Sequence, residues 1–166
     1  MELVEFRRQK DELFRSPDSP LSPSDQTSFQ GLKYWPENPA LHLHLPLNEN
    51  VDHDFVMMQT STGGQRRYVR AGKIEFQVGG ESATLFLYKD DHGYFMPFRD
   101  GTSAIESYEA GRYLEPEMGD DKLLDVDFNL AYNPYCAYSE HFSCPLPPRE
   151  NWIKGRIEAG EKKFHE

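Results

Sequence analysis

Apolar residues at the start of the chain recur at helical spacing, with Glu, Arg and Lys between them. This pattern predicts an amphipathic helix of about three to four turns. Ser16-Pro17 ends the predicted helix, because the residue before a proline is pushed out of the α region. The Ser- and Pro-rich stretch up to residue 30 is expected to lie as an arm over the domain, with a short helical turn near Ser24. The apolar positions of the helix are Leu3, Phe6, Leu13 and Phe14.

From residue 41 onward the pattern changes to the alternation that is typical of strands. In the segment 73–78, apolar side chains fall on one face and Glu75 and Gln77 on the other, and Gly79-Gly80 then indicates a hairpin. We expect strands at residues 41–45, 55–60, 66–70, 73–78, 83–88, 94–98, 108–114 and 123–130, and another within 152–164.

Short strands joined by tight turns predict an antiparallel meander. A strongly bent sheet or a barrel-like closure would hide the sheet edges. The expected architecture is therefore a mainly β single domain over residues 1–166, in which the helix and arm occupy 1–30 and the β domain occupies 41–164.

The composition supports a folded core and argues against some classes of binding partner. Hydrophobic residues make up only 37% of the chain, but 13% of all residues are aromatic, and each aromatic side chain can bury a large area. The formal net charge is −10. Because nucleic acids and anionic membrane surfaces attract basic proteins, we expect neither as a partner.

The first residues lack the basic segment and apolar stretch of a secretion signal, and no apolar run approaches the roughly 20 residues of a membrane span. We therefore expect a cytoplasmic protein. Its two cysteines do not make a disulfide framework and are expected to remain thiols in a reducing compartment.

Distinctive segments fill the C-terminal third of the chain. They read FMPFRDGTSAIESYEAGRYL, DVDFNLAYNPYCAYSEHFSCPLPPREN and IEAGEK. Together with the N-terminal helix and FQGLKYWP, they resemble the domain-of-unknown-function family 1684 of bacteria and archaea over nearly the whole chain. The resemblance implies no activity, since none is known for the family. The chain departs from the family pattern after Tyr108, where the family usually has Gly, and His42, His44 and His141 do not match family positions.

Arg112 and Asp127 are the first candidates for a site. If their predicted strands pair, the two side chains meet across the sheet. A buried Arg–carboxylate pair is costly to desolvate, and such a pair can orient a substrate carboxylate or phosphate. A purely structural ion pair that closes the sheet is the alternative.

The second candidate is the irregular loop with the spacing C-x4-H-x2-C, formed by Cys136, His141 and Cys144. A nucleophilic thiol needs a nearby base and a lowered pKa, and His141 is positioned to provide the base. The three side chains also suit a metal, with His42 and His44 completing the set. Because zinc motifs have tighter Cys pairs, we assign no metal. Buried cysteines that lock the loop are the simpler interpretation.

The leading functional hypothesis is a small-molecule-binding domain with a polar pocket at the mouth of the sheet. One alternative is a hydrolase-like or metal-assisted enzyme that uses the Cys136 loop or the Asp127 group, and another is a structural partner in a complex. Phosphate-binding glycine motifs, GxSxG and HExxH are absent, so the sequence assigns no cofactor and no reaction. The candidate ligand-binding residues are Arg99, Arg112, Tyr113, Asp127, Asn129, Tyr132 and Cys136.

Overall fold

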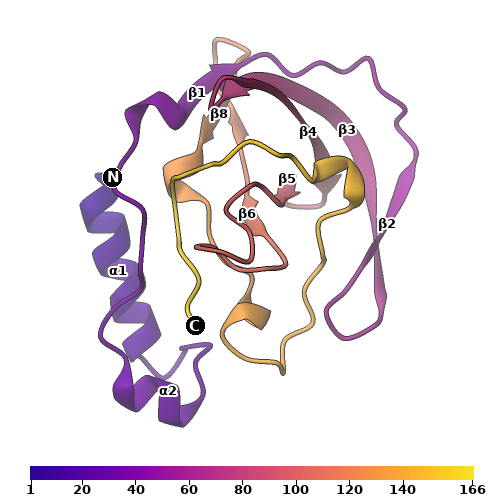
Figure 1. Cartoon of the computed structure of the whole chain (residues 1–166). Coiled ribbons are helices and arrows are strands. Elements are labelled where there is room, and N and C mark those ends of the chain that lie inside the picture. The colour runs from indigo at the N-terminus through magenta and orange to yellow at the C-terminus, as the bar shows by residue number, and fades with distance from the viewer.

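Two antiparallel sheets stand beside an N-terminal helix in the computed structural model, which describes all of residues 1–166 (Figure 1). The fold is mostly β with a bent meander, as predicted, but the sheets do not close into a barrel. The five-stranded sheet has the order β2 (Phe55–Gln59), β3 (Gln65–Val78), β4 (Glu81–Asp90), β5 (Gly93–Phe98) and β6 (Arg112–Leu114). The three-stranded sheet has the order β1 (His42–Leu45), β8 (Leu124–Asp127) and β7 (Glu117–Met118).

The predicted N-terminal helix is confirmed as α1 (Leu3–Arg15). Its Phe14 is fully buried and packs edge-on against Tyr138, with ring centroids 4.9 Å apart. The arm contains α2 (Pro23–Ser28), whose first turn is capped by the Ser22 hydroxyl. The C-terminal segment runs between α1 and the sheets (Figure 1). No helix combines the length and apolar character that crossing a membrane requires.

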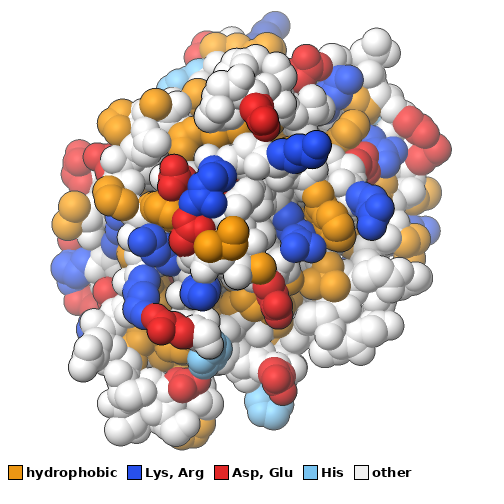
Figure 2. All heavy atoms as spheres, viewed as in Figure 1, with side chains coloured by type: hydrophobic (Ala, Val, Ile, Leu, Met, Phe, Trp, Pro, Cys, Tyr) orange, Lys and Arg blue, Asp and Glu red, His pale blue; other side chains and the backbone are white.

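Charged side chains of both signs occur on the face seen in Figure 2, where acidic, hydrophobic or uncharged atoms separate Lys and Arg side chains. Several basic side chains are engaged by carboxylates. Arg70 lies 2.7 Å from Glu150, and Lys10 lies 2.9 Å from Glu161. These contacts neutralise basic groups within the protein itself.

A β-bulge in β3 allows the five-stranded sheet to bury both of its faces. Pairing with β4 shifts by one residue between Arg70 and Gly72, so the side chains exchange faces at that point. Tyr68, before the bulge, packs on one face, whereas Ile74, after it, packs in the main core on the other. The partners of Tyr68 on its face are Met58, Tyr88, Phe95 and Tyr113.

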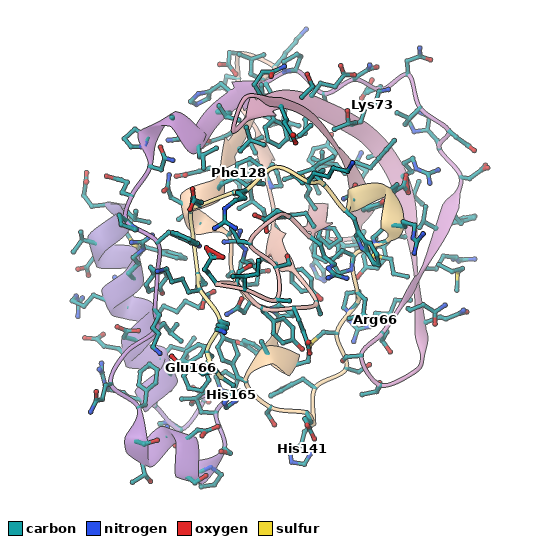
Figure 3. All side chains as sticks on the ribbon, viewed as in Figure 1. Arg66, Lys73, Phe128, His141, His165 and Glu166 are labelled. Atoms are coloured by element: carbon teal, nitrogen blue, oxygen red, sulfur yellow. The ribbon has the colours of Figure 1, made fainter.

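The main core draws apolar side chains from both sheets and from the C-terminal segment. Phe128, labelled in Figure 3, is fully buried directly after β8. Its ring centroid lies 5.4 Å from that of Phe76 on β3 and 5.6 Å from that of Phe98 on β5. This aromatic group ties the three-stranded sheet to the five-stranded one.

Several predicted strands need correction. The segments 66–70 and 73–78 form one bulged strand, β3, and β7 was not predicted. The strand predicted at 108–114 is confined to Arg112–Leu114, because a turn closes from Gly111 N–H to Tyr108 O. Gly111 has φ +104°, and a Cβ there would lie 2.4 Å from Phe98 O, so only glycine fits this turn.

The strand predicted at 123–130 ends at Asp127, whose carboxylate accepts the Asn129 N–H and starts a 3-10 helix, Phe128–Leu130. The strand predicted within 152–164 is wrong, since this segment makes only isolated bridges, Arg99 with Trp152 and Tyr34 with Glu161. The remaining 3-10 helices are Pro39–Leu41, Tyr135–Ala137 and Arg149–Asn151.

Candidate functional site

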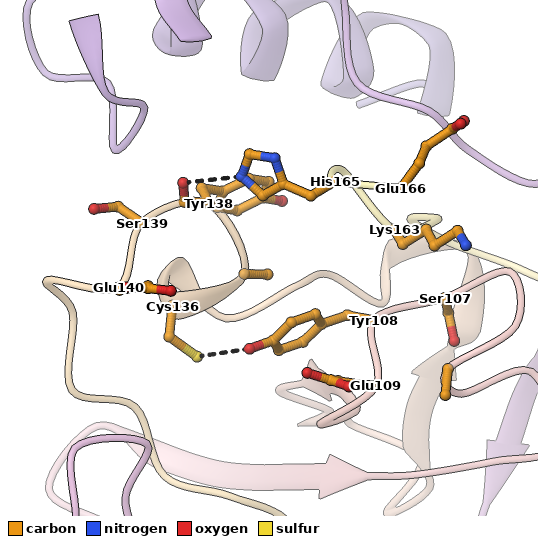
Figure 4. Close-up of a pocket in the computed structure, with 12 residues that line it drawn as sticks. Ser107, Tyr108, Glu109, Cys136, Tyr138, Ser139, Glu140, Lys163, His165 and Glu166 are labelled. Carbon is orange, nitrogen blue, oxygen red and sulfur yellow. Dashed lines mark hydrogen bonds between the residues drawn. The ribbon is translucent and has the colours of Figure 1, made fainter. Parts of the chain in front are cut away.

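An open hollow of about 600 Å³ lies where three distant segments of the chain meet (Figure 4). Its walls come from the turn around Tyr108, from the 3-10 helix that carries Cys136, and from the last residues of the chain. The side chains on these walls include Tyr108, Glu109, Cys136, Glu140, Lys163 and His165.

Cys136 is the cysteine that lines this hollow. The Tyr108 hydroxyl lies 3.7 Å from its sulfur (Figure 4). The Cys136 main-chain N–H donates to Cys144 Sγ at 3.3 Å. Hydrogen bonds from Cys144, Tyr108 and Ser61 lower the pKa of the Cys136 thiol to about 6, although burial opposes this. A thiol with this pKa is mostly thiolate at neutral pH.

Cys144 is the protonated neighbour of this thiolate. It is buried, whereas Cys136 is half-buried and lines the hollow. Donating to Cys136 and burial both raise the pKa of the Cys144 thiol far above its usual value. The pKa values of the two neighbouring thiols are therefore shifted in opposite directions.

Ionisable groups of both signs surround the thiol. Lys163 and His165 stand on the wall formed by the C-terminal residues, and Glu109 and Glu140 on the others. The His165 ring is held in place, with Nε2 3.3 Å from the Tyr138 main-chain oxygen (Figure 4). The hollow can therefore contact a ligand that carries both positive and negative groups.

Arg112 does not pair with Asp127, which corrects the sequence-based expectation. β6 pairs with β5, whereas β8 pairs with β1 and β7. The Arg112 guanidinium is fully buried and lies 3.4 Å from Asp100. Its two terminal nitrogens donate to Asp100 and to the C-terminal segment and so cross-link distant parts of the chain, whereas its buried Nε has no partner. Its further acceptors are the main-chain oxygens of Ile157, Ala159 and Glu161.

Asp127 and Asn129 hold the main chain together. The Asp127 carboxylate accepts the Asn129 N–H at 3.0 Å and the Asn129 amide at 2.9 Å. The Asn129 side chain also bonds both the N–H and the C=O of Asn38, at 2.8 and 3.0 Å. These contacts fix the chain entering β1 to the chain leaving β8.

The other predicted ligand-binding residues do not gather around the Cys136 hollow. Arg99 stacks on the ring of Trp152, 4.5 Å from its centre. Tyr113 is buried and donates its hydroxyl to the main-chain oxygen of Pro145, and Tyr132 donates to Glu115. Of the predicted set, Cys136 is the member that lines the hollow.

The histidines considered for the Cys136 loop lie elsewhere. His141 is exposed and labelled at the tip of its loop, away from the body of the protein (Figure 3). His42 and His44 lie on β1 and gather with Asp125 of β8 instead. The two alternatives weighed for this loop, a His141 base and a metal site that adds His42 and His44, are therefore not assembled at the Cys136 hollow.

Tyr108, Lys163 and His165 were missed by sequence reasoning. Tyr108 lies within the segment FMPFRDGTSAIESYEAGRYL, but no spacing in that segment connects it with Cys136. Lys163 and His165 sit in a polar tail without any motif. Only the folding of the tail over the domain brings them to the hollow.

Comparisons with known proteins give the family but no activity. No curated protein matches the chain. An uncharacterised protein of Haloarcula marismortui, solved in solution by NMR, superposes with a TM-score of 0.73 and is 36% identical. The match covers 99% of this chain and 94% of the other. The model of the protein family of unknown function DUF1684 matches residues 27–162. The chain therefore belongs to the DUF1684 family.

Proposed function

We propose that the protein binds a small polar disulfide in the Cys136 hollow and exchanges thiol and disulfide with it. The observation that carries this proposal is the position of the Cys136 sulfur on the wall of the hollow, with a second thiol, Cys144, directly behind it. The ligand-binding hypothesis is kept, but its site moves from Arg112 and Asp127 to Cys136.

Activation of the thiol needs no histidine base here. Hydrogen bonds from Tyr108 and Cys144 stabilise the thiolate, and the thiolate is the nucleophilic form of cysteine. The thiol most effective in exchange has a pKa near the ambient pH, because a lower pKa ionises the thiol but also makes the thiolate less nucleophilic. Cys136 meets this condition at neutral pH.

The exchange proceeds in two balanced steps. The Cys136 thiolate attacks one sulfur of the bound disulfide R–S–S–R′, forms a mixed disulfide and releases R′–S⁻. Cys144 loses its proton to the released thiolate and attacks the Cys136 sulfur, so that the second thiol leaves. The protein, starting as one thiolate and one thiol, gives up two electrons and one proton, and the second product leaves as R–S⁻, which takes its proton from the solvent.

The charges in the hollow indicate the class of disulfide. Lys163 and His165 suit carboxylates on the ligand, while Glu109 and Glu140 suit amines. A disulfide built from amino acids or short peptides carries both groups. Such a ligand also fits a volume of about 600 Å³.

The first test mixes the reduced protein with glutathione disulfide as the probe. The wild type is expected to release two thiols per chain and to form the Cys136–Cys144 disulfide, because the second sulfur resolves the mixed disulfide. Mass spectrometry follows the protein, and a colorimetric thiol assay follows the released product. The C144S variant is expected to stop at the mixed disulfide and to release one thiol.

The C136S variant is the matched control and is expected to release none. If C136S reacts as fast as the wild type, or if the wild type forms no Cys136–Cys144 bond, the proposed exchange is wrong. A ligand that binds in a thermal-shift assay without thiol release would favour the simpler binding hypothesis.

A second prediction concerns pH. The rate at which iodoacetamide alkylates Cys136 is expected to rise with pH through about 6 and to level off above it, since the thiolate fraction follows the lowered pKa. For a thiol with an unperturbed pKa, the alkylation rate would keep rising up to about pH 8.5. Peptide mass spectrometry after timed quenching gives the rate for each cysteine separately.

The Tyr108→Phe variant tests the cause of the lowered pKa. Losing the hydroxyl donor removes stabilisation of the thiolate, so the midpoint of the rate profile should move to higher pH. Cys144 should stay unreactive throughout this range in both proteins. A Cys136 profile that still rises at pH 8 in the wild type would contradict the assignment.

A further inference from the structure

His42 and His44 of β1 and Asp125 of β8 form a cluster that is separate from the Cys136 hollow. One ligand atom from each residue can be chosen so that all three lie within 4.8 Å of one another. Asp125 Oδ1 lies 2.6 Å from His42 Nε2 and 3.9 Å from His44 Nε2. We propose that these three residues bind a zinc ion.

The strands place the three side chains on one face. His42 and His44 are two residues apart on β1, and His44 stands directly opposite Asp125 in the antiparallel register. The reverse face of both strands is anchored, because Val126 is fully buried and Leu43 packs against the main core. The main chain that carries the cluster is therefore fixed before any ion arrives.

The donor set suits zinc. Two neutral imidazoles and one carboxylate are zinc ligands at about 2.0–2.2 Å, and a site with three protein ligands leaves the fourth position to water. The three side chains are exposed, so small rotations can bring their ligand atoms around one ion. The oxygen-rich sites that magnesium and calcium prefer contain no such pair of imidazoles.

Asp127 supports the ring of His42 from behind. Its Oδ2 lies 3.8 Å from His42 Nδ1, the ring nitrogen turned away from Asp125. Its other oxygen is already fixed by Asn129. A carboxylate on the far nitrogen of a zinc-bound histidine orients the ring and makes it a stronger ligand. At 3.8 Å the two atoms are not hydrogen-bonded, and on zinc binding the His42 ring would turn so that Nδ1 donates to the candidate ligand-binding residue Asp127.

The surroundings attract a cation. The Asp125 and Asp127 carboxylates face the histidine rings, and neither lies within 4.0 Å of a Lys or Arg nitrogen, although the Arg7 charge acts on Asp127 from farther away. Glu117 of β7 stands opposite Asp125, and both line an acidic hollow of about 250 Å³ that also contains Asp127.

The test is calorimetric titration of the full chain, stripped with a chelator, with zinc chloride. The expected result is one ion bound per chain. His44→Ala and Asp125→Asn should each weaken the affinity on the order of 10-fold or more. His92→Ala, which removes an exposed histidine of the β4–β5 turn, is the matched control and should leave the affinity unchanged.

Cobalt substitution separates this site from the two thiols. Cobalt bound by the histidines and Asp125 shows no sulfur-to-metal charge-transfer absorption, and C136S should bind zinc as the wild type does. The proposal is overturned if no zinc binds, if H44A and D125N bind it like the wild type, or if C136S loses the ion.

Discussion

Replacing Arg112 by methionine is expected to lower the free energy of unfolding by about 3–5 kcal/mol. The guanidinium is fully buried and bonds Asp100 and three main-chain oxygens of the C-terminal segment. Methionine fills similar volume but leaves those oxygens without donors and Asp100 without its counter-ion. Burial lowers the pKa of Arg112, which shows that desolvation of this charge is costly. The measurement is urea unfolding followed by tryptophan fluorescence.

Two variants make this prediction specific. Arg112→Lys keeps the charge but cannot reach several acceptors at once, so it should also be clearly destabilised. Arg67→Met removes an exposed arginine that stacks on Phe55, and its unfolding midpoint should stay close to that of the wild type. Arg112→Met unfolding at the same urea concentration as Arg67→Met would show that the buried cross-link contributes nothing.

Short-range pattern was enough to predict α1 and most of the meander. The alternation around Ile74 and the Gly79-Gly80 turn determine a hairpin locally, and both glycines have the positive φ that this turn needs. The bulge between Arg70 and Gly72 was not predicted, because alternation continues on both sides of it. The tail after Trp152 was misjudged because its partners, the Asp100 carboxylate and isolated main-chain bridges, lie in distant segments.

The candidate site was predicted only in part for the same reason. Cys136 and Cys144 were recognised as candidates because they share one loop. The prediction that Arg112 pairs with Asp127 was wrong because the strand order places β6 beside β5. This order depends on packing across the whole core. Asp100, the true partner, follows β5 closely and forms a compact turn with Thr102. Tyr108 and Asp125 likewise reach the two proposed sites through tertiary contacts.

Replacing Glu161 by alanine is expected to lower the free energy of unfolding by about 3 kcal/mol. Its carboxylate is 1% exposed and accepts the Tyr138 hydroxyl at 2.5 Å, the Asn133 N–H at 2.9 Å and the Lys10 ammonium at 2.9 Å. Alanine would leave two buried donors without an acceptor and Lys10 without its counter-ion. Urea unfolding gives the change in stability.

The Glu161 carboxylate also joins three parts of the chain. Its loss should therefore loosen the attachment of α1 more than it loosens the five-stranded sheet. Lys10 belongs to α1 and Tyr138 to the segment lining the Cys136 hollow. Hydrogen exchange in α1 should therefore accelerate more than exchange in β3 and β4, which pair independently of Glu161. The matched control is Glu166→Ala, which removes a carboxylate of the same tail that forms an exposed ion pair with Lys33. Its effect on the free energy of unfolding should be close to zero. Equal stability of the two variants would mean that α1 is held by the packing of Phe14 rather than by Glu161.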